Sequence, residues 1–199
     1  MNEADQLKWD RIYTGGAEKA AEPCRVLSSH SHLLPAEGDA LDLACGRGGN
    51  ALYLAARGFS TRAWDVSAVA VQSLSDIAAH NNLPLMAEQR DVTANPPASG
   101  SFDVIVVSRF LDRALAPAIC TALREHGLLF YQTFIREKVA GTGPNNPAYR
   151  LEPNELLRLF QPLHIIYYRE EGCVGDTHEG FRNEAMLVAQ KRQNAGDGF

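Results

Sequence analysis

The segment with the clearest structural signal in this sequence of 199 residues is Leu41-Asp42-Leu43-Ala44-Cys45-Gly46-Arg47-Gly48-Gly49-Asn50-Ala51. The apolar residues 40–45, which overlap its start, predict a buried strand. Gly46, Gly48 and Gly49 predict a tight turn after it. A helix is expected next over residues 50–57, closed by Gly58. Because glycines let a ligand approach the backbone and a helix start offers unpaired N–H groups, the segment predicts a ligand site at the turn.

Similar strand–helix units follow along the chain. Further strands are expected over residues 59–66, 83–92, 102–108 and 128–134, and further helices over 67–80, 117–127 and 153–160. The last two strand candidates, 163–170 and 185–191, have no helix between them, which favours antiparallel pairing. We therefore predict an α/β fold of three layers, with a mostly parallel sheet and a C-terminal antiparallel hairpin.

The composition and charge of the chain limit the classes of protein to which it can belong. The chain has 19 basic and 24 acidic side chains and contains no block of Lys or Arg, so we expect no nucleic-acid partner. No apolar run approaches the roughly 20 residues that span a bilayer, and residues 1–6 do not resemble a secretory signal. A cytoplasmic protein without a membrane partner is expected. The four cysteines are far apart and predict reduced thiols and no metal site.

Acidic residues end two of the predicted strands. Asp65 comes 19 residues after Gly46, where an acid can accept hydrogen bonds from both ribose hydroxyls, and Asp91 ends the third strand. Asp42, just before the glycines, suits a cationic ligand group better than a pyrophosphate. This pattern favours a nucleoside held by its sugar and its adenine edge. The glycine spacing alone also fits the dinucleotide fingerprint, so an NAD-dependent oxidoreductase remains an alternative.

Several motifs together resemble class I S-adenosylmethionine-dependent methyltransferases. They are residues 41–48, Trp64-Asp65-Val66-Ser67, Arg90-Asp91-Val92, Phe102-Asp103-Val104-Ile105 and the opening Trp9-Asp10-Arg11-Ile12-Tyr13. The resemblance implies a Rossmann-like fold with a seven-stranded sheet and S-adenosyl-L-methionine as the cofactor. The cofactor-binding residues that it implies are Asp42, Gly46, Arg47, Gly48, Asn50, Asp65, Val66, Asp91, Val92 and Ser108.

Within that superfamily the chain is most similar to the tellurite-resistance (TehB-type) small-molecule methyltransferases. The similar segments are residues 46–54, 110–113, 154–156 and 175–179. This resemblance implies a small methyl acceptor, such as a thiol or a chalcogen oxyanion, with His178 and Arg182 as catalytic candidates beside it. An acceptor with a hydroxyl or a protonated amine needs a general base, for which His178 is the first candidate and Tyr131 a weaker one.

Other interpretations remain open at this point. A methyltransferase of RNA or protein, and a cofactor-binding protein without catalysis, are both compatible with the motifs. We expect a single domain over residues 1–199, with a lid or helix region at 1–38, a core at 39–192 and a flexible tail at 193–199, in a monomer or homodimer. Residues 136–150 form a long loop of turn-forming residues, for which we predict a mobile cover over the acceptor pocket.

Overall fold

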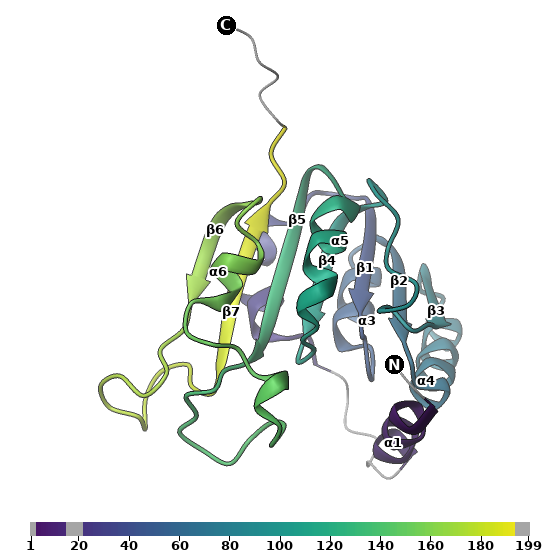
Figure 1. The fold of residues 1–199 in the computed structure, drawn as a ribbon. Helices are drawn as coiled ribbons and strands as arrows, with labels where there is room; N and C mark the ends of the chain where they lie inside the picture. Colours follow the sequence, from purple (N-terminus) through teal and green to yellow (C-terminus); the bar gives the residue numbers. More distant parts are fainter. Residues whose placement is uncertain (1–2, 15–21, 194–199) are drawn as a thin grey trace, which may run out of the picture.

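A seven-stranded sheet forms the centre of the computed structural model, which describes residues 3–14 and 22–193 (Figure 1). The strands are β1 (Asp39–Leu43), β2 (Ser60–Asp65), β3 (Leu85–Gln89), β4 (Phe102–Ser108), β5 (Leu123–Phe134), β6 (His164–Arg169) and β7 (Glu184–Gln190). Their spatial order is β3-β2-β1-β4-β5-β7-β6. The neighbours from β3 to β5 pair in parallel, whereas β7 is antiparallel to both β5 and β6. The predicted mostly parallel sheet and its C-terminal antiparallel hairpin are confirmed.

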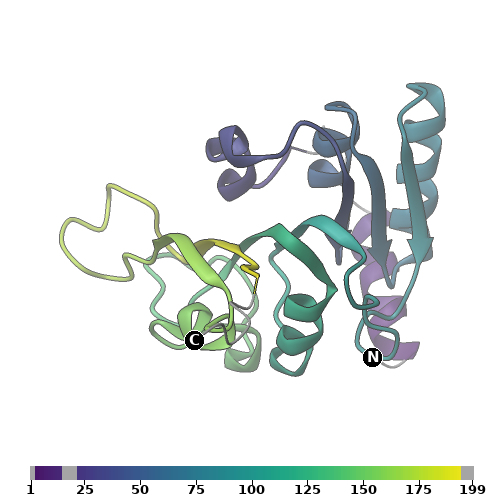
Figure 2. The same ribbon diagram turned by 90° about the horizontal axis from the view of Figure 1, so that it is seen from above.

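Helices cover both faces of the sheet. They are α1 (Glu3–Thr14), α2 (Arg25–Ser29), α3 (Gly49–Ala55), α4 (Ala68–His80), α5 (Ala116–Ala122) and α6 (Glu155–Leu159). Seen from above, α2, α3 and α4 lie on one face, and α5 and α6 lie on the other (Figure 2). No helix in the two described ranges is long and apolar enough to cross a membrane.

The alternation of side chains along β4 explains why both faces need cover. Val104 and Val106 pack into the core that contains Leu27 and Leu54, whereas Ile105 and Val107 pack into the opposite core with Ile119 and Leu156. All four β4 residues are fully buried. A continuous β-branched strand is therefore the pattern expected of a parallel strand with helices on both sides.

One predicted boundary is wrong. The helix expected over 117–127 ends at Ala122, and β5 begins at Leu123. Phe102 pairs with Leu123 and Val104 pairs with Leu128, so residues 124–127 form a bulge in β5. Leaving the helix places the Arg124 guanidinium against two carboxylates of neighbouring strands, those of Asp39 and Asp103. This long-range pairing competes with helix continuation and cannot be inferred from local propensity.

The parallel strands place the functional candidates at one edge. The order of strands reverses between β1 and β4, and in such sheets ligands bind beyond the carboxyl ends of the strands at the reversal. The helix α1, at lower right in Figure 1, lies near this edge and packs against α4. The predicted lid or helix region therefore contains α1 and α2, whereas the expected tail lies, apart from Gln193, outside the described residues.

Candidate functional site

The glycine turn after β1 is joined directly to the end of β2. The backbone N–H of Gly46 donates a hydrogen bond of 2.8 Å to Oδ2 of Asp65, and Oδ1 of Asp65 accepts one of 2.9 Å from the N–H of Ser67. Gly46 has φ +53°, a left-handed conformation that favours glycine. Asp65 is 6% exposed, and burial raises the pKa of its carboxyl although these hydrogen bonds oppose the shift.

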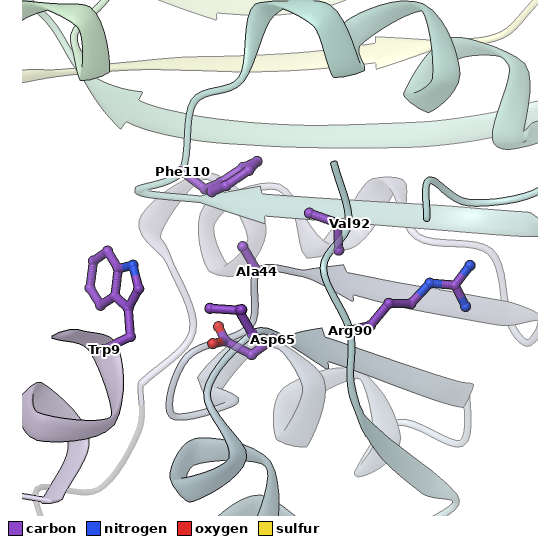
Figure 3. A pocket seen from close by; sticks show the side chains of 7 residues that line it. Trp9, Ala44, Asp65, Arg90, Val92 and Phe110 are labelled. Carbon is purple, nitrogen blue, oxygen red and sulfur yellow. The ribbon is translucent and has the colours of Figure 1, made fainter. Parts of the chain in front are cut away.

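A cavity, here called the first cavity, opens above this carboxylate. Its lining residues are Trp9, Ala44, Asp65, Val66, Arg90, Val92 and Phe110. Figure 3 shows Asp65 and Ala44 near its centre, Trp9 from the side of α1, and Phe110 and Val92 across from them. Its lining of one carboxylate, one guanidinium and apolar side chains suits a flat base with an attached sugar.

The helix α1 fills much of the space at this site. The first cavity measures about 30 Å³, far below the roughly 300 Å³ at which small-molecule sites usually begin. A Cβ atom added to Gly46 would lie 2.6 Å from the hydroxyl oxygen of Tyr13, so the Tyr13 phenol occupies the space above the bare glycine. Because a nucleoside needs more room than this cavity offers and Tyr13 stands above the glycine turn, we expect the side chains of α1 to move when one binds.

Polar contacts hold α1 in this position. Oδ1 of Asp10 accepts a hydrogen bond of 2.5 Å from the hydroxyl of Ser67, at the start of α4. Nη2 of Arg47 donates to the backbone oxygen of Tyr13, and its guanidinium lies 5.6 Å from the centre of the Tyr13 ring. Arg47, predicted to bind cofactor, thus contacts α1 in this arrangement.

Asp42 and Asn50 form a buried polar pair below the turn. The two oxygens of Asp42 accept hydrogen bonds from Nδ2 of Asn50 and from the backbone N–H of Ala51, both at 3.1 Å. Nδ2 of Asn50 also lies 3.2 Å from the hydroxyl of Ser108, to which it donates. Burial raises the pKa of Asp42 to about 7, although the hydrogen bonds from Asn50 and Ala51 lower it. Asp42 itself has no exposed surface.

The second glycine of the turn serves packing. Gly48 has φ +73°, and a Cβ atom there would lie 2.4 Å from a methyl carbon of Leu74 in α4. A side chain at this position would push α4 away from the turn. Gly48 lies in the turn, as predicted. Its missing side chain allows the turn to pack closely against Leu74 in the core.

A larger cavity, here called the second cavity, lies beyond the ends of β4 and β5. Its lining residues are Glu22, Pro23, Cys24, Arg25, Ser108, Arg109, Gln132, Phe181, Arg182 and Glu184, and its volume is about 580 Å³. This volume lies within the usual range of small-molecule sites. The turn formed by residues 108–110 separates the two cavities, because Ser108 and Arg109 line the second and Phe110 lines the first.

The remaining predicted residues are placed as follows. Asp91 lines neither cavity, and its Oδ1 accepts hydrogen bonds from the N–H and the hydroxyl of Thr93. Arg182 lines the second cavity, whereas His178 lies in the loop between β6 and β7, with a side chain that is 93% exposed and contacts Asp176. The structure therefore gathers Asp65, Val66 and Val92 at the first cavity and Ser108 and Arg182 at the second. Their roles in binding and catalysis stay predictions.

The buried Tyr131 and the half-buried Cys24, both near the cavities, are held in their protonated form. The hydroxyl of Tyr131 donates to the backbone oxygen of Phe110, and burial raises the pKa of this phenol well above its usual range. Burial likewise raises the pKa of the Cys24 thiol to about 12. Neither group is suited to accept a proton or to attack as an anion near neutral pH.

Sequence reasoning missed the long-range partners of the second cavity. Glu184 was not considered, although its carboxylate contacts both Arg109 and Gln132. No local motif marks this residue, because its partners lie on other strands. The only sequence signal for a role of Glu184 is that a carboxylate stands at the start of a strand predicted to be buried.

The loop at residues 136–150 has a defined internal support. The buried guanidinium of Arg150 donates hydrogen bonds to the backbone oxygens of Ile135, Thr142 and Pro144. Arg113 also reaches this loop and donates to the backbone oxygen of Ala148. None of its residues lines either cavity in this arrangement, so its predicted role as a mobile cover gains no support from the contacts.

Comparison with known proteins places this geometry in a family. The model of the family described as tellurite resistance protein TehB matches residues 12–187. The chain is 25% identical over 189 residues to the probable S-adenosyl-L-methionine-dependent methyltransferase TehB of Haemophilus influenzae, covering 88% of this chain and 60% of that protein. The crystal structure of TehB from Haemophilus influenzae superimposes with a TM-score of 0.71 at 18% identity, covering 92% of this chain and 67% of that one.

A second curated relative matches a shorter part of the chain. The identity is 40% over 89 residues to hemagglutinin 1 of Eikenella corrodens, covering 43% of this chain and 29% of that protein. This chain thus spans less than two thirds of the length of both curated relatives. The family match, in contrast, extends over most of the sequence. It includes the glycine turn, the strand ends beside both cavities and most of β7. The chain belongs to the tellurite resistance protein TehB family.

Proposed function

We propose that this protein is an S-adenosyl-L-methionine-dependent methyltransferase that acts on a small molecule. One observation carries the proposal: the turn at residues 108–110 separates a cavity with features suited to a nucleoside from a polar cavity of small-molecule size. A methyl group transferred in line must pass directly from donor to acceptor, so the two sites must adjoin. Family membership supports the same reaction class.

The residues at the first cavity fit the proposed cofactor. Each oxygen of Asp65 accepts one backbone hydrogen bond and retains a lone pair for a ribose hydroxyl. Val92 and Phe110 offer apolar surface to the adenine. The bare backbone of Gly46 leaves room for the chain that carries the sulfur once the Tyr13 phenol moves away from it. When bound, S-adenosyl-L-methionine supplies a methyl group activated by a positively charged sulfur.

The chain's own contribution is alignment and exclusion of water. Asp65 and the glycine turn fix the donor side, and the buried contacts of Ser108 with Asn50 fix the turn that faces the acceptor. Trp9 and Tyr13 of α1 are placed to cover the donor once it is bound. Holding two reactants in a productive orientation can contribute roughly 7–11 kcal/mol to lowering a barrier.

Isothermal titration calorimetry with S-adenosylhomocysteine tests the donor site. We expect saturable binding by the wild type, no binding of NADH, and at least tenfold weaker binding by Asp65→Asn, which loses the anionic acceptor for the ribose. Asp76→Asn is the matched control, because within residues 3–14 and 22–193 this exposed carboxylate on α4 accepts a hydrogen bond only from the exposed side chain of Gln72. Circular dichroism checks that each variant is folded.

Two results would contradict the proposal. One is binding of NADH but not of S-adenosylhomocysteine, which would favour the oxidoreductase. The other is full cofactor binding without methyl transfer to any of a panel of thiols, phenols and chalcogen oxyanions, together with transfer to RNA or protein. That second result would retain the cofactor site and reject the small acceptor.

A further inference from the structure

The second cavity contains three arginines whose guanidinium groups are used in different ways. Arg25, Arg109 and Arg182 line it together with the carboxylates of Glu22 and Glu184. Which of these cations has hydrogen-bond donors left for a ligand depends on the contacts that each already makes.

Arg182 has few donors left. Its guanidinium donates to the backbone oxygens of Glu171, Gly172, Val174, Asp176 and Glu179. The side chain is only 13% exposed, and its ε nitrogen lies 3.7 Å from the carboxylate of Glu171. Arg182 therefore shapes the loop between β6 and β7, which forms one wall of the cavity.

Arg109 is held by one edge only. Its Nε donates a hydrogen bond of 3.0 Å to Oε1 of Glu184, whereas its two terminal amino groups have no hydrogen-bond partner among the described residues. The side chain is 67% exposed at the cavity, and Glu184 is 10% exposed. When a guanidinium forms its hydrogen bond through Nε, the edge formed by its two terminal nitrogens can still donate to a planar anion.

The support below this contact is buried and extends into the sheet. The second oxygen of Glu184 accepts a hydrogen bond of 2.5 Å from Nε2 of Gln132, and Oε1 of Gln132 accepts one of 2.9 Å from the N–H of Val26. The backbone of Arg109 has φ +54°, an unfavourable conformation for a residue with a side chain, and its N–H donates to the oxygen of Gln132. Such local strain persists only where surrounding contacts impose it.

The cavity also offers apolar surface beside its cations. The guanidinium of Arg25 lies 5.6 Å from the centre of the Phe181 ring, and Pro23 also lines the cavity. A volume of about 580 Å³ greatly exceeds the needs of an oxyanion of a few atoms. The guanidinium groups, the ring of Phe181 and this volume together fit an organic molecule that carries both a carboxylate and an apolar group.

We propose that Arg109 is a specificity-determining residue that binds the carboxylate of an organic methyl acceptor, and that Glu184 and Gln132 are positioning residues that orient it. The part of this inference that makes the bound carboxylate a methyl acceptor rests on the proposed function. The presence of an organic-anion site in the second cavity can be tested separately from cofactor binding.

Benzoate is a suitable probe, and benzamide is its neutral counterpart of the same shape. Each is titrated into the full-length protein by calorimetry, with and without saturating S-adenosylhomocysteine. We expect the wild type to bind benzoate at least tenfold more tightly than benzamide. Arg109→Gln should lose at least tenfold in benzoate affinity and keep its affinity for S-adenosylhomocysteine. Arg62→Gln removes the same charge from an exposed position outside both cavities and should behave as wild type.

The variant Glu184→Gln separates orientation from simple charge. Removing this carboxylate makes the cavity more positive, so a purely electrostatic site would bind benzoate more tightly. If Glu184 orients Arg109, the variant should instead bind benzoate several-fold more weakly. Circular dichroism and urea unfolding establish that the variant is folded.

Three outcomes would overturn the proposal: equal binding of benzoate and benzamide, unchanged benzoate binding by Arg109→Gln, or tighter benzoate binding by Glu184→Gln. Sulfate that displaces benzoate at equal or lower concentration would also overturn it, in favour of a site for inorganic oxyanions. Failure of S-adenosylhomocysteine to bind would reject the cofactor assignment alone, because the comparison of Arg109 variants is also made without cofactor.

Discussion

Asn50 accepts a hydrogen bond of 2.8 Å from the backbone N–H of Cys24, so the helix after the glycine turn is attached directly to the wall of the second cavity. The same amide donates to Asp42 and to Ser108 on two neighbouring strands. One buried side chain therefore joins three segments that surround the candidate site. Its exposed fraction is only 4%, so water cannot easily replace these contacts.

Replacing Asn50 by alanine should destabilise the protein and loosen the second cavity. The change leaves Asp42 and the N–H of Cys24 each without one buried partner, and we expect a loss of about 1–3 kcal/mol in the free energy of unfolding. Urea unfolding measures this loss. Asn81→Ala is the control, because the Asn81 amide donates only on the surface, to the oxygen of Ile77. Equal stabilities of the two variants would contradict the bridging role of Asn50.

Gly46→Ala should abolish cofactor binding. A β-carbon at this position would occupy the space above the turn, 2.6 Å from the Tyr13 hydroxyl, and the left-handed φ adds strain. We expect no measurable heat with S-adenosylhomocysteine. Gly58→Ala is the matched control, because Gly58 has φ +90° and a β-carbon there meets open space. That variant should lose stability and retain cofactor affinity. Normal affinity in Gly46→Ala would place the ligand elsewhere.

The sequence predicts those parts of the site that depend on strand ends. Asp65 and Val92 follow directly from the alternation of strands and helices, because the carboxyl end of a parallel strand always faces the ligand edge. The structure places both at the first cavity. The mostly parallel pairing and the C-terminal hairpin likewise follow from local patterns of apolar residues and from the missing helix between the last two strands.

The second cavity could not be predicted in this way. Its organising contacts join Arg109 to Glu184 and Gln132 to Val26, across 75 and 106 residues of sequence. Gly48 shows the same limit, since the left-handed turn favours a glycine there but the packing against Leu74 on a different helix also requires one. Contacts of this kind depend on tertiary packing, which no local propensity contains.

The carboxyl of Asp42 should make stability depend on pH. Burial raises its pKa to about 7, so the folded chain holds a proton there that the unfolded chain releases near its usual pKa of 3.8. The resulting stabilisation is fully present below that usual pKa and is lost as the pH rises through 7. Urea unfolding should show the free energy of wild type falling relative to that of Asp42→Asn, by at most about 1.4 kcal/mol per pH unit.

The difference should become constant only well above the folded pKa, from about pH 9. Asp76→Asn, which removes an exposed carboxylate, should instead follow the wild type across the whole range. A free-energy difference between wild type and Asp42→Asn that does not change between pH 5 and pH 8 would show that Asp42 is already ionised throughout.

Variants of the loop between β6 and β7 should separate a structural role from a catalytic one. Arg182→Gln removes most of the donors that hold the backbone oxygens of this loop, so hydrogen exchange of the amides at residues 171–181 should accelerate. His178→Ala should leave that exchange unchanged, because its side chain is exposed and, in the part of the chain that the structure describes, forms a hydrogen bond only with Asp176. If His178 takes part in transfer, this variant should still bind S-adenosylhomocysteine normally while its methylation of 4-mercaptobenzoate slows. Unchanged turnover would leave His178 with a surface role, and unchanged exchange in Arg182→Gln would contradict the assignment of Arg182 to loop order.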